Sequence, residues 1–502
     1  MRLSVPNPFS KQLLAAMLLN AIVALIFWLY IQMFGSLISR YTAYFFVAPF
    51  LLIVLFQWKN PVYKTAAPIF TLIFLENVII SRIPAIAVPY MNDQAVFFRL
   101  GVTFIFALTV VCSFMYYKEK FRLPRYMTPM WLLFLGLAVA SMVIGGSVDF
   151  GLLSGNVSDF ITYYLEFFLF FYLGYRAFES SGEVKQLLLL FVVFGIITAV
   201  AHIFAITTGT NLESLRGQEA VAESRDLSQN NWRYGGFLGN VNTMSAFYVM
   251  LIPASLYMLF SERALYKKVI AAVAMISMLI SMLLGASRGG LLWSALGIIV
   301  ALFYLRIGWQ KIIGGLLFVA AVVFVANSLL NQFFMEYLQR AFDEISRKGT
   351  DSPREMIWYY TMFIIRDNPF GIGLSTHNYA IKLRYYANME WSNPHNMYLE
   401  MITQTGFAGL AVFVSIVGRV IASNIKAYIK TKETESREAL VFLLLFIAGF
   451  MLMGFTEPIF RNQYKLNHLF GLLIGISMSL SGRILTGQIK NNNDDKTRVN
   501  TE

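Results

Sequence analysis

Apolar runs near twenty residues long recur along this chain of 502 residues, and they constrain its fold more than any other feature. Only 14% of the residues are charged, whereas a soluble globular domain has about a quarter. A helical run of that length crosses the hydrocarbon core of a bilayer and satisfies its own backbone hydrogen bonds there. We therefore predict an all-α polytopic membrane bundle with about 12 to 14 transmembrane helices.

The hydropathy pattern predicts fourteen membrane spans. We interpret the first as an uncleaved span rather than a signal peptide, because it is too long for a signal-peptide core and lacks a small-residue cleavage site. The predicted spans cover residues 12–34, 41–56, 66–83, 96–116, 129–145, 158–178, 184–207, 239–260, 267–285, 288–306, 310–330, 396–425, 438–456 and 464–482.

The distribution of Lys and Arg between the spans predicts the orientation. With the N-terminus placed inside, the inner segments carry 22 Lys and Arg, and the short outer loops carry 5. Cytoplasmic loops collect positive charge, so both termini are expected in the cytoplasm. The same rule accounts for the net charge of +12 without invoking nucleic acid as a partner.

Two long segments, 208–238 and 331–394, interrupt the succession of spans and short loops, and both fall on the predicted outer face. Loops this long in a compact protein are usually functional. We therefore divide the chain into an N-terminal transmembrane region (1–207), a transmembrane core (208–486) that contains an extracytoplasmic loop (331–395), and a polar, disordered cytoplasmic tail (487–502).

The large loop contains a clear helix signal. Ser352 is a suitable N-cap, Pro353 suits the first helical position, and Glu355 completes a capping box. The helix is expected to end near Arg366, where the sequence DNPFGIG predicts a turn. Its many aromatic residues suggest that it lies at the surface of the outer leaflet and caps a cavity.

His395 is the first candidate for chemistry. If Asn393 caps the following helix and Pro394 takes its first position, His395 falls in the first turn. The positive end of a helix dipole favours an uncharged imidazole, which is the form that a general base requires. The alternative is an interfacial histidine that only caps the helix.

Arg233, Arg288 and Arg354 are predicted on the same outer face as His395. An arginine at the edge of a bilayer is costly without a partner, and its planar guanidinium matches phosphate oxygens. Taken singly, each could be a snorkelling or salt-bridged side chain. Three arginines and one base at a single outer mouth favour a site for pyrophosphate.

Several other ionisable groups are notable. Intramembrane charges are functional candidates by default, although Glu76 and Arg99 could simply pair with each other. At an outer span end, Glu457 and Arg461 either line the cavity or bond locally. The remaining groups at membrane depth are Glu166, His202, which we expect to make a buried polar contact, and Arg419.

Four segments in this order resemble the bacterial O-antigen ligase/O-antigen polymerase superfamily. They are RYGGFLGNVN, SRGG at the start of a span, SPREMIWYYTMFIIRDNPFGIG, and PHNMYLEMITQTGFAGL. The resemblance covers about residues 233–410.

The resemblance implies a GT-C-type helical fold and a metal-independent, inverting glycosyltransferase without a cofactor. Such an enzyme acts at the outer leaflet of the inner membrane on a glycan carried by undecaprenyl pyrophosphate. It also implies that His395 is the base for the acceptor hydroxyl and that Arg233 and Arg288 bind the pyrophosphate, with Arg354 as a further arginine. A flippase and a chain-length regulator are possible protein partners.

The sequence leaves the exact activity open. A polymerase would pass the growing chain to the next lipid-linked repeat unit, whereas a ligase would pass it to a lipid A core or another acceptor. We favour a polymerase that makes a capsule, exopolysaccharide or O-antigen-type glycan. A flippase would line the whole bilayer with polar groups, often across pseudo-symmetric halves, and a non-catalytic scaffold would leave the arginines and His395 without a purpose.

Overall fold

The described part of the chain is entirely helical in its regular structure. The computed structural model describes residues 123–148, 153–178, 180–208, 241–285, 287–304, 353–389, 391–461 and 464–488. The predicted spans 12–34, 41–56, 66–83, 96–116 and 310–330 lie outside these residues. So does the predicted tail beyond residue 488.

The predicted spans within the described residues are helices. Seven of these helices are long and apolar enough to cross a membrane, so the chain is a polytopic helical membrane protein. Those seven are α6 (Thr128–Val148), α9 (Ser181–Thr208), α10 (Val241–Ser261), α11 (Leu265–Leu284), α17 (Met397–Lys430), α18 (Thr434–Met453) and α19 (Tyr464–Leu485).

Two further predicted spans correspond to shorter elements. The span predicted at 158–178 is composite, because a π-helix interrupts it, and the span at 288–306 is α12 (Arg288–Tyr304). The composite segment contains α7 (Leu153–Asp159), the π-helix η4 (Phe160–Leu165) and α8 (Glu166–Ala177).

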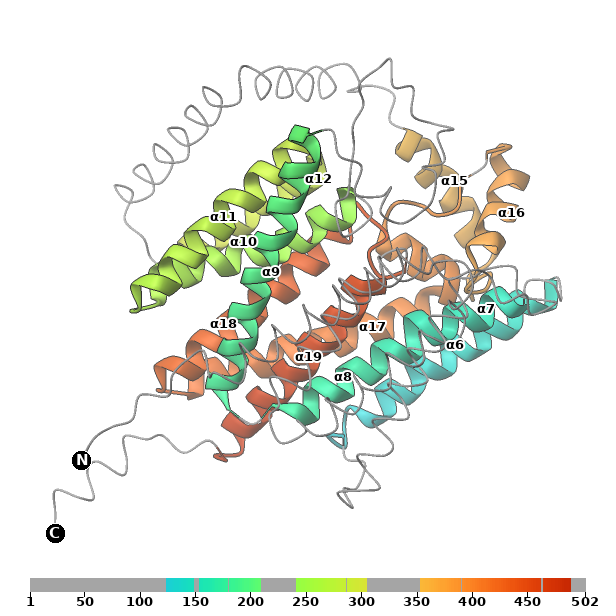
Figure 1. The fold of residues 1–502 in the computed structure, drawn as a ribbon. Helices are drawn as coiled ribbons and strands as arrows, with labels where there is room; N and C mark the ends of the chain where they lie inside the picture. Colours follow the sequence, from blue (N-terminus) through green and yellow to red (C-terminus); the bar gives the residue numbers. More distant parts are fainter. Residues whose placement is uncertain are drawn as a thin grey trace, which may run out of the picture.

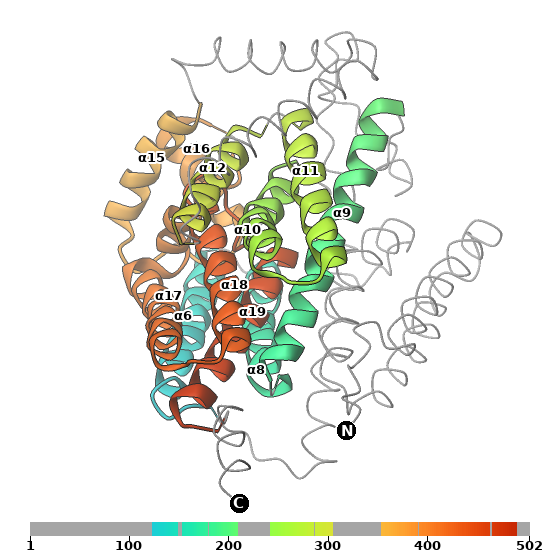
Figure 2. The ribbon, with the colours of Figure 1, turned by 90° about the vertical axis from the view of Figure 1, so that its left-hand side faces the viewer.

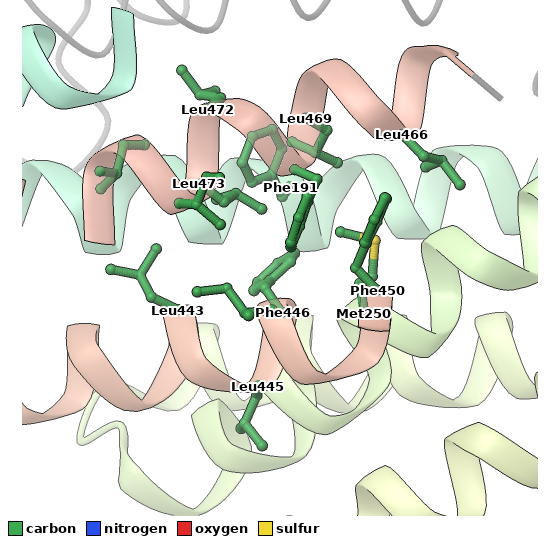
Figure 3. Close-up of a cluster of buried hydrophobic side chains, with 14 of the residues drawn as sticks. Phe191, Met250, Leu443, Leu445, Phe446, Phe450, Leu466, Leu469, Leu472 and Leu473 are labelled. Atoms are coloured by element: carbon green, nitrogen blue, oxygen red, sulfur yellow. The ribbon is translucent and has the colours of Figure 1, made fainter. Parts of the chain in front are cut away.

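The helices lie side by side in a bundle (Figures 1 and 2). Buried aromatic and aliphatic side chains fill the space between them. Phe450 of α18 stacks on Phe470 of α19 with ring centroids 3.9 Å apart, and Phe191 of α9 reaches Phe446 of α18 (Figure 3). Aromatic pairs of this kind contribute beyond the area that they bury. Among the seven candidate membrane spans, α10 has the largest buried share, and it packs against α9, α11, α12 and α18.

One end of the bundle carries basic segments that were predicted to face the cytoplasm. Lys185 at the start of α9 pairs with Glu262 after α10 and with Glu438 at the start of α18, at 3.1 and 2.6 Å. Lys430 at the end of α17 donates to the carbonyl oxygen of Leu485 at the end of α19. These segments thus share one end of the bundle, and the side of the membrane that it faces stays a prediction.

At the opposite end lies a small lobe formed by α15 (Pro353–Asp367) and α16 (Thr376–Ala387) (Figure 1). The predicted loop helix is α15, and it ends within one residue of the expected position. α16 was not predicted. Ile364 of α15 packs with Tyr379 and Leu383 of α16, so the lobe has a small apolar core of its own.

A strap of residues 368–375 joins this lobe to a break in α17. Gly406 has φ 71° and ψ 179°, which divides the helix and releases carbonyl groups of the preceding turn. The carbonyl oxygen of Thr403 accepts from Ile372 N at 2.8 Å, and that of Gln404 accepts from the Ser141 hydroxyl. Gly371 allows this approach, since a Cβ there would lie 2.2 Å from the Gln404 carbonyl oxygen. The strap and Ser141 of α6 therefore satisfy backbone groups that a broken helix would otherwise leave unpaired.

Candidate active site

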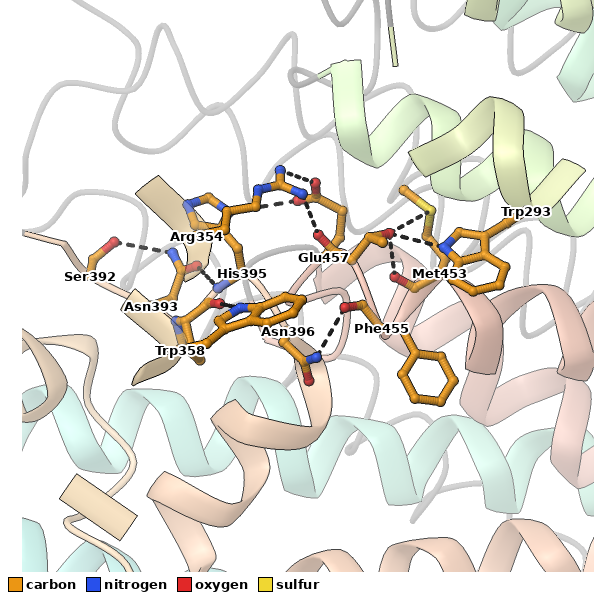
Figure 4. Close-up of polar contacts among 12 residues, drawn as sticks. Trp293, Arg354, Trp358, Ser392, Asn393, His395, Asn396, Met453, Phe455 and Glu457 are labelled. Atoms are coloured by element: carbon orange, nitrogen blue, oxygen red, sulfur yellow. Dashed lines mark hydrogen bonds and ion pairs between the residues drawn. The ribbon is translucent and has the colours of Figure 1, made fainter. Parts of the chain in front are cut away.

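The candidate site lies where α15, the start of α17 and the turn between α18 and α19 meet. The buried carboxylate of Glu457, in that turn, contacts two of the predicted residues (Figure 4). One oxygen lies 2.9 Å from Arg354 Nη2, and the other lies 3.9 Å from His395 Nδ1. Arg354 Nη1 also donates to the carbonyl oxygen of Thr456 at 3.1 Å. The structure thus brings His395 and Arg354 together around one carboxylate.

The local backbone places His395 differently from the expectation. The N-cap of α17 is Asn396, whose side-chain oxygen accepts from the amides of Tyr398 and Leu399 at 2.9 and 3.0 Å, so the helix begins at Met397. The prediction that Asn393 caps the helix and that His395 falls in its first turn is wrong. Two asparagines flank the Pro-His pair, and the second one bonds the free amides of the helix.

His395 instead occupies a constrained position just before the helix. Its φ is 50°, in the left-handed region, which is uncommon for a residue other than glycine and clusters at functional sites. Its amide donates to the Asn393 side chain at 3.0 Å, and the carbonyl oxygen of Pro394 accepts from Trp358 Nε1 at 2.7 Å (Figure 4). These two bonds fix the backbone on both sides of the imidazole.

The surroundings of the imidazole suit a base. Trp391 packs edge-on against it, with ring centroids 5.4 Å apart, and Nδ1 is buried without a hydrogen-bond partner among the described residues. A separation of 3.9 Å from Glu457 is too long for a hydrogen bond, but catalytic contacts often tighten only when substrate binds. A carboxylate facing Nδ1 favours the tautomer that carries its proton there, which leaves Nε2 as the acceptor.

The start of α12 meets the same turn. Arg288 is the first residue of α12, and a Cβ on the adjacent Gly289 would lie 2.9 Å from Thr456 Oγ1. Trp293 of α12 donates to that hydroxyl at 3.1 Å (Figure 4). The backbone of Arg288 is therefore next to the turn that carries Glu457. The side chain of Arg288 and the whole of Arg233 lie outside the described residues.

Arg461, four residues after Glu457, turns to a second polar cluster. It pairs with Asp159 at the end of α7, and its Nη1 lies 4.0 Å from the Glu400 carboxylate of α17. The sequence left open whether Glu457 and Arg461 line the site or bond locally. In the structure, Glu457 faces the site, and Arg461 links its own turn to α7 and α17.

The other ionisable groups noted in the sequence have structural partners where they are described. Glu166 lies 2.6 Å from His468, and His202 contacts the Ser281 hydroxyl at 2.8 Å, as the expected buried polar contact. Arg419 lies over the Tyr126 ring at 5.9 Å. Glu76 and Arg99 are outside the described residues.

Sequence reasoning did not assign roles to Trp358, Trp391, Asn396 and Thr456. The Asn-Pro-His-Asn run contained the signal for the second cap, because each asparagine could cap a following segment. The contacts of Trp358 and Thr456 join segments far apart in the sequence, and no local pattern predicts them. Within the described residues, no group of three or more His, Cys, Asp or Glu side chains could hold a metal ion.

The fold and this site define a multi-pass helical membrane protein with a histidine, an arginine and a carboxylate gathered at one end of the bundle. Residues 271–414 match the family model described as O-Antigen ligase. This match supports the O-antigen ligase/O-antigen polymerase superfamily and confirms the resemblance found in the sequence. No curated protein matches the chain.

The matched segment contains most of the candidate site. It includes Arg288, Arg354 and His395, whereas Arg233 and Glu457 lie outside it. The family supports a glycosyltransferase-type function of the ligase or polymerase kind, with lipid-linked glycans as substrates. Together with the seven apolar helices, it suggests a multi-pass protein of the inner membrane.

Proposed function

We propose that this protein is an outer-leaflet glycosyltransferase that polymerises undecaprenyl-pyrophosphate-linked repeat units into a cell-surface polysaccharide. The observation that carries the proposal is the contact of one carboxylate, Glu457, with both His395 and Arg354. Two of these three residues lie in the segment that matches the family, and the third faces them from a different part of the chain. The product would be of the capsule, exopolysaccharide or O-antigen type.

In the proposed reaction, His395 Nε2 accepts the proton of an acceptor hydroxyl. The hydroxyl oxygen attacks the anomeric carbon of the donor glycan, and the bond from that carbon to the pyrophosphate oxygen breaks. The lipid pyrophosphate leaves with the bonding electrons and needs no proton from an acid. A single displacement of this kind inverts the anomeric centre, and a positioned base contributes about 10²- to 10⁴-fold to the rate.

Arg233, Arg288 and Arg354 would bind the pyrophosphate and stabilise its growing charge in this metal-independent reaction. Arg354 is now held by Glu457 at 2.9 Å, so an incoming pyrophosphate would compete for it. Once Arg354 has moved to the pyrophosphate, the Glu457 carboxylate would contact His395 alone. Donor binding would then shorten the contact that orients the base.

A ligase that passes the glycan to a lipid A core would use the same donor site, and a flippase is the alternative of a different class. A ligase requires a second acceptor. Purified protein reconstituted with lipid-linked repeat units alone should therefore form polymer if it is a polymerase and none if it is a ligase. A flippase mutant would trap repeat units on the inner leaflet, which leaflet-resolved labelling of the glycan would show.

The decisive test is His395→Ala in the native host. The variant should reach the membrane, yet polymer growth should stop and single lipid-linked repeat units should accumulate on the outer leaflet. His377→Ala is the matched control, because His377 is an exposed histidine in α16 of the same lobe. Polymer of normal length from the His395→Ala protein would refute the role of His395 as base.

A further inference from the structure

Two buried side chains one turn apart on α17 have unmet hydrogen-bonding capacity. Glu400 and Gln404 are 3% and 4% exposed. Neither carboxylate oxygen of Glu400 has a hydrogen-bond partner among the described residues, and neither does Gln404 Nε2. Buried polar groups are normally paired, and each unpaired one is costly. A pair of acceptors beside a free donor points to a ligand that supplies the missing groups.

The groups around this pair hold it in place. The Tyr164 hydroxyl donates to Gln404 Oε1 at 3.0 Å, which leaves the amide nitrogen for another partner. Tyr164 belongs to the π-helix η4, and π-helical turns often occur at functional sites. The Arg461 guanidinium lies 5.9 Å from the centre of the Tyr163 ring, from the same π-helix. These contacts link the carboxylate, the amide and the two tyrosines into one connected cluster.

This cluster adjoins the candidate active site. The Glu400 amide donates to the carbonyl oxygen of Asn396 at 2.9 Å, so Glu400 lies one helical turn beyond the residue that follows His395. The start of α17 and the α18–α19 turn therefore meet twice. His395 faces Glu457 at the first contact, and Glu400 faces Arg461 at the second.

The charges select the kind of ligand. The Glu400 carboxylate disfavours phosphate, so this cluster does not extend the pyrophosphate site. A metal cation is disfavoured by the guanidinium 4.0 Å from Glu400. A neutral polyol fits, because its hydroxyl groups can donate to both carboxylate oxygens while another hydroxyl oxygen accepts from Gln404 Nε2.

We propose that Glu400 and Gln404 form a subsite for the acceptor sugar, whose hydroxyl loses its proton to His395. The subsite rests on the proposed function, because it orients the substrate of that reaction. It is assigned to the acceptor because it adjoins the candidate base, whereas the start of α12 and α15 carry the arginines proposed for the donor pyrophosphate. Both side chains act by positioning this sugar through direct hydrogen bonds.

The test uses the full chain in lipid nanodiscs. The probe is the free repeat-unit oligosaccharide, released by mild acid from lipid-linked units extracted from the native host. It should raise the Tm of the wild-type protein and of His395→Ala, but not that of Glu400→Gln or Gln404→Met. In the wild-type background, Glu400→Gln should raise the KM for this acceptor by about ten- to a hundredfold.

Asn424→Leu is the matched control, because Asn424 is a buried amide on α17 far from the cluster. It should keep the stabilisation by oligosaccharide and the wild-type KM. If Glu400→Gln and Gln404→Met also keep both, the cluster holds only water and the subsite is refuted. If Glu400→Gln does not fold, the same measurements are made on Glu400→Asp, which keeps the carboxylate but shortens the side chain by one methylene group. Normal polymer from His395→Ala would overturn the proposed function instead, while oligosaccharide binding would still report on the subsite.

Discussion

Glu457 Oε2 lies 3.9 Å from His395 Nδ1, although 62 residues separate the two in the sequence. The carboxylate comes from the turn after α18, and the imidazole from the segment before α17. A single side chain thus ties the candidate base to the bundle and also holds Arg354.

Replacing Glu457 with Gln should lower the transfer rate by at least about tenfold, because the amide no longer favours a proton on Nδ1. The measurement is kcat with lipid-linked repeat units, together with Tm to verify folding. Glu355→Gln is the control, since Glu355 is an exposed acid beside Arg354 in α15. Wild-type kcat in Glu457→Gln would mean that the carboxylate does not orient the base.

Gly406→Ala should destabilise the protein by about 1–3 kcal/mol, because the left-handed φ strains any other residue. A Cβ there would also lie 2.6 Å from the Pro369 carbonyl oxygen of the strap. Gly418→Ala, in the same helix, meets nothing within 4 Å and should be neutral or stabilising by about 0.5–1 kcal/mol. Thermal unfolding in detergent compares the two, and equal Tm values would contradict the strained break.

Asn396→Ala should cost about 0.5–2 kcal/mol through loss of the N-cap of α17. Asn396→Asp keeps the capping oxygen, and both variants lose the bond from Asn396 Nδ2 to the Phe455 carbonyl oxygen. The difference in Tm between the two variants therefore isolates the cap. No difference would show that another group satisfies the first amides of the helix.

Lys185→Met should destabilise the opposite end of the bundle by about 1.5–3 kcal/mol, since it removes the cation between Glu262 and Glu438. Arg263→Met removes an exposed cation near the same end and should have little effect. Thermal unfolding in nanodiscs reports both. An equal loss in the two variants would attribute the effect to net charge rather than to the ion pairs.

The lobe should show an acid-sensitive contact between its two helices. The Arg366 guanidinium, and next the Tyr386 hydroxyl, hold the pKa of Asp367 below its ordinary value of 3.8. The stabilisation that this contact gives the folded lobe is therefore complete above that ordinary pKa, and it is lost as the pH falls through the lower folded-state pKa. Hydrogen exchange in α16 should be slower in the wild type than in Asp367→Asn at pH 6, and this difference should shrink as the pH falls below 3.8.

Local patterns predicted the helices and much of the candidate site. Apolar runs long enough to cross a bilayer identify the spans, and the Ser-Pro-Arg-Glu start with its Asp-Asn-Pro stop identified α15. α16 was missed because its apolar face is narrow, with Tyr379 and Leu383 as its buried hydrophobic residues.

The remaining features depend on contacts between distant segments. The interruption at Gly406 was not foreseen, since a glycine within an apolar run usually continues a helix. The approach of Glu457 to His395 follows from how α17 and α18 pack, and hydropathy does not record it. The sequence placed His395 on the correct segment but three residues too far into the helix, because either of two asparagines could cap it.

The strap that enters the interruption in α17 also determines how this protein can be recombined with relatives. The Ile372 amide donates to the Thr403 carbonyl oxygen, and Gly371 and Gly406 let the two backbones approach closely, so residues 368–375 and 403–406 form one packed unit despite their separation in the sequence. A chimera that exchanges the lobe alone would combine the strap of one protein with the helix break of another. Crossover points placed before α15 and after Gly406 would transfer the strap and the helix break together.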